Sequence, residues 1–250
     1  LVGRDRARPR VTGGDTVLEP TWDGDPTALA DEIVHNNVRS SEALVHGRVW
    51  DVRREAVELG DGQTVVRDYV VHPGAVGVLA LDDHDRVLLV RQYRHPVGLA
   101  LWEPVAGLLD VADESPRDGA ARELVEEAGL VAGRWDVLVD FENSPGGSSE
   151  TIRCYLGRDL APAPGGRPDG DGEERDMPFA WVPLDSAVEG VLEGRFTAPL
   201  TVAGVLAAYA SRAGGWASLR PADSPWPQRE HVAGTDRARV YGARIQRENH

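Results

Sequence analysis

The 250-residue sequence lacks lysine altogether and has a single cysteine, Cys154, and a single methionine. All 27 basic residues are therefore arginine, and 41 acidic residues bring the formal net charge to −14. Such a chain is repelled by nucleic acid phosphates and by anionic membranes, so we expect neither as a partner. One cysteine excludes an internal disulfide and fits a cytoplasmic protein, and we expect Cys154 to be a buried strand residue.

Long apolar stretches are also missing from the sequence. No run reaches the roughly 18 residues that a membrane-spanning helix requires, so we expect no transmembrane segment. The first ten residues, LVGRDRARPR, contain arginine but no apolar core, which argues against a secretory signal.

The sequence before the main domain divides into two segments of different composition. Residues 1–40 are rich in Gly, Pro, Asp and Arg, so we expect a disordered or loosely packed segment with at most a short helix at Ala28–Val34. Residues 41–73 alternate between polar and apolar side chains, which predicts antiparallel strands. So small a strand set is unstable alone and must pack on the main domain or on a second subunit.

Residues 74–213 contain both strand and helix patterns and form the main domain. The apolar run Gly74–Leu81 indicates a buried strand. From residue 214 the sequence loses periodicity, and we expect 214–250 to form an extended tail. The other predicted elements are strands at Arg86–Gln92, Trp135–Phe141, Thr151–Leu156 and Phe179–Pro183, and helices at Leu184–Glu193, with Asp185 as N-cap, and Pro199–Arg212.

A further helix, between residues 115 and 129, carries the strongest functional signal. Ser115 and Pro116 are start signals and Gly129 is a stop signal. Within the helix Glu123 and Glu127 share one face at i and i+4, where like charges destabilise a helix unless a cation is present. Together with Glu126 they can form either a solvated acidic face, with Arg122 paired to Glu126, or the oxygen ligands of a divalent cation.

The whole stretch from Ala106 to Leu130, AGLLDVADESPRDGAARELVEEAGL, resembles the Nudix box, G-x5-E-x7-R-E-U-x-E-E-x-G-U with U apolar. The match is complete from Glu114 onward. Six residues rather than five separate Gly107 from Glu114, in a loop where an insertion is tolerated. The resemblance favours the metal-binding interpretation of the acidic helix.

The resemblance extends from about Val45 to Ala213 and points to the ADP-ribose pyrophosphatase branch of the Nudix hydrolases. It implies an α/β/α sandwich with a mixed sheet, preceded by a small antiparallel strand set that exchanges between the subunits of a homodimer. It also implies Mg²⁺- or Mn²⁺-dependent cleavage of ADP-ribose, or a related nucleoside diphosphate sugar, to AMP and ribose 5-phosphate. The segments that carry it beyond the box are VRQYRHPVGLALWEPVAGLLD from Val90, SPGGSSE from Ser144 and VLEGRFTAPLTVAGVLA from Val191.

The resemblance assigns a role to each candidate site residue. Glu123 and Glu127 would be the principal metal ligands, with Glu126 and the Ala106 carbonyl as additional ones. Glu150, at the end of a glycine-rich loop, would be the general base or a further metal ligand. The remaining expectations are Arg67 (from the exchanged strand), Arg94 and Glu103 as substrate contacts, Gly107, Glu114 and Arg122 as structural residues of the box, and Trp102 as a core residue or a base-stacking one.

Two alternatives remain at the level of function. One is a Nudix enzyme acting on another nucleotide, such as a modified nucleoside triphosphate. The other is a catalytically silent Nudix domain that senses ADP-ribose and regulates transcription. The second needs a DNA-binding module, and neither flank shows a basic helix-turn-helix pattern.

Overall fold

The computed structural model describes residues 24–168 and 177–234 and divides the chain into two units, Leu1–Val34 and His35–His250. Most of the segment expected to be disordered and the end of the expected C-terminal tail therefore lie outside the described residues. None of the helices in the described part of the chain has the length and apolar character needed to cross a membrane.

The described part of the first unit contains one short 3-10 helix, η1 (Pro26–Ala28). The Asp25 carboxylate caps it by accepting a hydrogen bond from the Thr27 N–H at 2.8 Å. The helix expected at Ala28–Val34 is wrong, since Leu29–Val34 is exposed and has no helical turn. A segment this short cannot sustain a helix in water without an apolar surface to pack against.

The second unit begins with a three-stranded antiparallel sheet in the order β1-β2-β3. This confirms the predicted N-terminal strand set, whose first strand begins a few residues before the expected start. The side chains of β1 are exposed along its whole length. The bounds are β1 (Asn37–His46), β2 (Asp51–Glu58) and β3 (Thr64–Val71).

Two further sheets form the body of the second unit. One is five-stranded and mixed, in the order β11-β8-β9-β4-β7, with β4 and β9 parallel; the other is three-stranded, in the order β10-β5-β6. The bounds are β4 (Ala75–Ala80), β5 (Arg86–Arg94), β6 (Leu99–Glu103), β7 (Val105–Leu108), β8 (Leu130–Glu142), β9 (Thr151–Pro162), β10 (Phe179–Pro183) and β11 (Arg220–Pro221), with the 3-10 turn η2 (His95–Val97) before β6.

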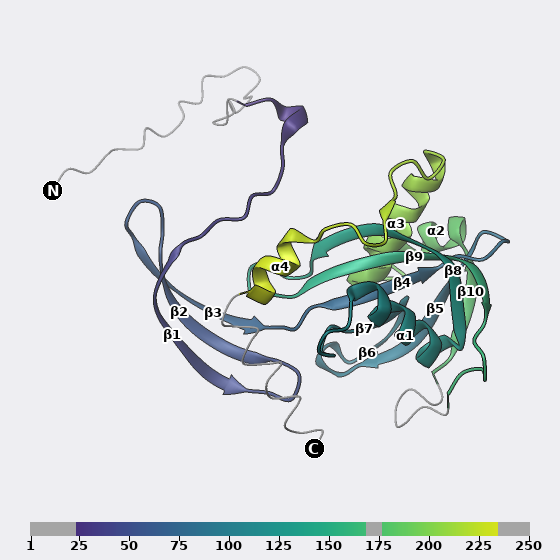
Figure 1. Cartoon of the computed structure of the whole chain (residues 1–250), viewed down its shortest axis with the longest axis horizontal. Coiled ribbons are helices and arrows are strands. Elements are labelled where there is room, and N and C mark those ends of the chain that lie inside the picture. Colours follow the sequence, from purple (N-terminus) through teal and green to yellow (C-terminus); the bar gives the residue numbers. More distant parts are fainter. Residues whose placement is uncertain (1–23, 169–176, 235–250) are drawn as a thin grey trace. The chain divides into compact units, whose positions relative to one another are not determined.

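Helices cover both faces of the five-stranded sheet, as Figure 1 shows, which confirms the predicted α/β/α sandwich. Helix α1 (Pro116–Ala128) packs through Leu124 in one core cluster, while α2 (Leu184–Leu192) and α3 (Pro199–Ala213) pack in a second. Successive residues of β9 alternate between the clusters, with Tyr155 in the first and Cys154 in the second. Burial raises the pKa of the Cys154 thiol to about 12, so this cysteine is a core residue, as expected.

Two expectations about the C-terminal half are wrong. Asp185 does not cap α2, because Pro183 occupies the N-cap position and Asp185 lies in the first turn. The stretch after residue 214 is not simply extended, since β11 pairs with β8 and the helix α4 (Pro227–Gly234) follows. These elements are short and lack periodicity, so their stability comes from packing on the main domain rather than from local sequence preference.

Candidate active site

Helix α1 begins and ends where the sequence signals predict. The Ser115 hydroxyl oxygen accepts a hydrogen bond from the Asp118 N–H at 3.1 Å, and Pro116 opens the helix. Gly129 ends it in the left-handed conformation, at φ 65°, with its N–H directed at the last carbonyls. The box therefore forms a rigid helix that projects its carboxylates from fixed positions.

The carboxylate of Glu123 lies against the backbone of β7. A Cβ atom added to Gly107 would lie 1.9 Å from Glu123 Oε1, so the glycine provides the space that this carboxylate fills. The contact places Glu123 beside the strand that also carries Ala106. The extra residue between Gly107 and Glu114 is accommodated in the loop without separating helix from strand.

Arg122 connects three carboxylates of the box. Its guanidinium donates two hydrogen bonds to Glu114, at 3.0 and 3.1 Å. Its Nη1 also donates to Glu123 Oε1 at 2.7 Å and to Glu126 Oε2 at 2.9 Å. These bonds raise the pKa of Arg122 well above its ordinary value, and the bonds to Glu114 make the largest contribution. The Arg122–Glu126 pair of the solvated-face interpretation is thus present, but as part of a larger network.

A second cation–carboxylate pair lies next to the box. Arg94 on β5 donates to both oxygens of Glu103 on β6, at 3.1 and 2.6 Å. The pKa of Arg94 is raised, first by the hydrogen bonds of Glu103 and then by the charges of Glu127 and Glu150. Glu127 and Glu103 are buried, at 6% and 7% exposure. The fold therefore gathers residues of β5, β6, α1 and the loop before β9 around one guanidinium.

Glu150, just before β9, lies next to two residues that sequence reasoning did not single out. Asn143 Nδ2 donates to Glu150 Oε2 at 2.6 Å, and His72 Nε2 lies 3.6 Å from Glu150 Oε1. Burial lowers the pKa of His72; the charge of Arg229 acts in the same direction and that of Glu150 opposes it. His72 follows β3 in the sequence VHPG, which resembles an ordinary turn and gives no local signal of this contact.

Arg67 and Trp102 are the remaining residues that were considered as substrate contacts. Arg67 is an exposed residue of β3, whose Nη1 donates to the Val66 carbonyl at 3.1 Å. Trp102 packs against the core cluster of α2 and α3 and accepts a bond at its carbonyl from the Thr201 hydroxyl, at 2.7 Å. The core interpretation of Trp102 therefore agrees with the structure better than base stacking.

The donor types at the box suit a hard divalent cation, because Mg²⁺ and Mn²⁺ take carboxylate and carbonyl oxygens. Gly107 leaves the space in which the Glu123 carboxylate lies against β7, the strand that also carries Ala106. Among residues 24–168 and 177–234, no three His, Cys, Asp or Glu side chains form a ready-made metal site. Arg122 donates hydrogen bonds to Glu123 and Glu126, so a cation bound by these two carboxylates would replace the guanidinium.

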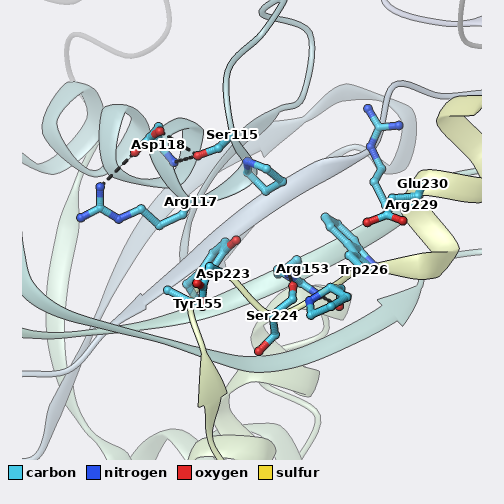
Figure 2. Close-up of a pocket in the computed structure, with 13 residues that line it drawn as sticks. Ser115, Arg117, Asp118, Arg153, Tyr155, Asp223, Ser224, Trp226, Arg229 and Glu230 are labelled. Carbon is cyan, nitrogen blue, oxygen red and sulfur yellow. Dashed lines mark hydrogen bonds and ion pairs between the residues drawn. The ribbon is translucent and has the colours of Figure 1, made fainter.

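A cavity of about 590 Å³ lies at the start of α1, as Figure 2 shows. Arg153, Trp226 and Arg229 line it, and the Arg153 guanidinium stacks on the Trp226 ring at 4.6 Å. Arg153 is also bonded to Asp140 and to carbonyls before α4, which makes it a structural residue. None of the residues that line the cavity belongs to the carboxylate cluster, which consists of Glu103, Glu114, Glu123, Glu126, Glu127 and Glu150. The candidate active site is therefore assigned to this cluster.

Comparison with known proteins identifies the family to which the chain is similar. The family model described as NUDIX domain matches residues 71–199. An ADP-ribose pyrophosphatase of Mycobacterium tuberculosis is 44% identical over 199 residues, which cover 80% of this chain and 95% of that protein. A methanol dehydrogenase activator of Bacillus methanolicus is 34% identical over 66% of this chain and 88% of its own length.

A solved structure described as an ADP compounds hydrolase shares the fold. It matches 74% of this chain and 98% of its own length with a TM-score of 0.63. The sequences are 23% identical, so this likeness supports the architecture alone.

Proposed function

The chain belongs to the Nudix family of hydrolases, and we propose that it cleaves ADP-ribose to AMP and ribose 5-phosphate. The observation that carries the proposal is the gathering of Glu127 and Glu150 around Arg94, beside an intact box. The substrate follows from the relative that is 44% identical and is an ADP-ribose pyrophosphatase. The test is a comparison of nucleotide sugars with nucleoside triphosphates as substrates.

We assign the cofactor as Mg²⁺, with Mn²⁺ as the alternative. Glu123 and Glu127 are the principal ligands in this proposal, and Glu126, Glu150 and the Ala106 carbonyl are additional ones. The bound cation would neutralise pyrophosphate oxygens and lower the pKa of the attacking water. The low exposure of Glu127 supports its assignment, because a buried carboxylate next to like charges is stabilised by a cation.

The chain's own residues would supply binding and proton transfer. Arg94, oriented by the two hydrogen bonds that it donates to Glu103, presents the rest of its guanidinium to phosphate oxygens. Water attacks one phosphorus, the bond from that phosphorus to the bridging oxygen breaks, and the other phosphate leaves with that oxygen. Glu150 accepts the proton of the water if it is the general base.

Two roles remain open for Glu150, general base or metal ligand. Asn143 donates to one of its oxygens, which leaves the other oriented toward His72. Either role requires a carboxylate held in place at the end of a loop. The silent-sensor alternative has less support, since the box carboxylates are all present.

We further propose a homodimer in which residues 41–73 exchange between subunits and Arg67 serves the partner's site. The exposed length of β1, with Leu44 and Val45 among its exposed apolar side chains, supports an interface there. Arg67 is an exposed residue of β3, so its side chain is accessible to a partner subunit. The single buried cysteine supports a cytoplasmic location for the enzyme.

A further inference from the structure

The connection between β3 and β4 contacts the loop that carries Glu150. The His72 side chain, 11% exposed, lies there with its ring Nδ1 accepting a hydrogen bond from the Gly74 N–H at 3.1 Å. Gly74 has φ +87°, a conformation that side-chain-bearing residues rarely adopt. The glycine thus lets the backbone turn back and bond to the ring two residues earlier.

This bond determines which ring nitrogen of His72 carries the proton. A nitrogen that accepts from a backbone N–H is unprotonated, so the proton of the neutral ring is on Nε2. Nε2 lies 3.6 Å from Glu150 Oε1, which is longer than a hydrogen bond. A shift of roughly 0.5 Å by the carboxylate would complete the bond. Because Asn143 donates to the other oxygen, Glu150 lies between two donors.

The backbone around His72 holds the same loop. The Val70 N–H donates to the Gly147 carbonyl and the Ser149 N–H donates to the Val70 carbonyl, both at 2.9 Å. The His72 N–H donates to the Ser149 hydroxyl oxygen, also at 2.9 Å. These bonds extend β3 along the loop, so ring and loop move together. Arg229 of α4 and Glu150 are the charged groups that act on the ring.

We propose that His72 is a positioning residue that holds the Glu150 carboxylate in its reactive orientation. The proposal rests on the function proposed above, because it gives Glu150 a role in turnover. A neutral ring donates one hydrogen bond and leaves the negative charge of Glu150 in place, which both the base and the ligand role require. Residues that orient a catalytic carboxylate in this way are worth roughly 10–100-fold in activity.

The kinetic test compares His72→Ala with His72→Gln, whose amide nitrogen can take the place of Nε2. We expect His72→Ala to lower kcat roughly 10–100-fold with KM changed little, and His72→Gln to recover most of the loss. His84→Ala, in the exposed turn between β4 and β5, is the matched control and should behave as wild type. Wild-type kcat in His72→Ala, or a loss confined to KM, would overturn the proposal.

A double variant separates positioning from a general structural effect. If His72 acts through Glu150, His72→Ala in a Glu150→Gln background should cost little further activity. Losses that multiply would show that His72 acts independently of Glu150, and would refute the proposal.

A spectroscopic measurement keeps this inference distinct from the choice of substrate. Ring-nitrogen NMR of the full-length protein should show His72 with its proton on Nε2, and Glu150→Gln should shift that nitrogen. A proton on Nδ1 would overturn the proposal even in an active enzyme. A wild-type protein inactive on every nucleotide tested would instead reject the proposed function and the role of His72 in turnover, even if the ring geometry is as described.

Discussion

Gly107 and Glu123 make a contact that only glycine permits, because an added Cβ would lie 1.9 Å from Oε1 and 2.1 Å from Cδ of Glu123. The glycine that opens the box pattern thus sets the position of one of its carboxylates. The extra residue in the following loop leaves the contact in place. The contact joins helix α1, which carries Glu123 and Glu127, to strand β7, which carries Ala106.

The first prediction concerns this contact. Gly107→Ala must displace the Glu123 carboxylate or push β7 from α1, and a misplacement of about 1 Å costs roughly 10²-fold in rate. We expect a loss of that order in kcat/KM, with weaker apparent affinity for Mg²⁺. Gly60→Ala is the control, since a Cβ there meets nothing within 4 Å. Equal activity of the two variants would show that Glu123 does not depend on Gly107.

A second prediction concerns Glu127, which Glu127→Gln converts to an uncharged side chain of the same size. If Glu127 is a direct metal ligand, activity should fall by orders of magnitude and partly recover at high Mg²⁺ concentration. Without metal, thermal stability should hold or rise slightly, because repulsion from Glu123 at i and i+4 is relieved. Activity at different metal concentrations and unfolding in EDTA measure both effects. Unchanged activity would mean that the box is a solvated helix face.

Glu150→Gln should behave differently if Glu150 is the general base. We expect kcat to fall by roughly 10²–10⁴-fold while the Mg²⁺ affinity stays close to that of wild type. Titration of metal binding to both variants distinguishes the roles. Equal loss of metal affinity in Glu127→Gln and Glu150→Gln would identify Glu150 as a ligand.

The proposed exchange of strands predicts complementation between two inactive variants. Arg67→Ala lacks the contact supplied to the partner's site, and Glu150→Gln lacks the carboxylate of its own. Mixed subunits should regain about a quarter of wild-type activity, since half of randomly formed dimers are mixed and carry one complete site. Light scattering checks the dimer itself. A monomer at micromolar concentration, or mixtures that stay inactive, would contradict the exchange.

Elements with a clear apolar periodicity, or with start and stop residues at their own ends, could be predicted from the sequence. Helix α1 has Ser115 and Gly129 at its ends, and the strands of the sandwich alternate or are continuously apolar, so both could be predicted. Helix α4 and strand β11 have no such period and depend on contacts with the main domain. Asp185 illustrates the limit of local rules, because an acidic residue near a helix start can lie in the first turn instead of at the cap.

The candidate site likewise contains residues that neighbouring sequence could identify and residues that only long-range contacts reveal. The box was identified by its resemblance to a known family pattern, most of whose positions lie on one helix. His72 was missed because its contacts, with Glu150 and the Ser149 hydroxyl, join segments that are far apart in the chain. The sequence His72-Pro73-Gly74 is typical of a turn. Only the folded chain brings the His72 ring close to the Glu150 carboxylate.

The most direct test of the central claim is kcat/KM, measured with Mg²⁺, for ADP-ribose, other nucleoside diphosphate sugars and a set of ordinary and modified nucleoside triphosphates. We expect the highest value for ADP-ribose, with AMP and ribose 5-phosphate as products and no turnover in EDTA. A clear preference for a triphosphate would contradict the proposed substrate. Binding of ADP-ribose without turnover under any metal would contradict the enzyme itself and favour a sensor.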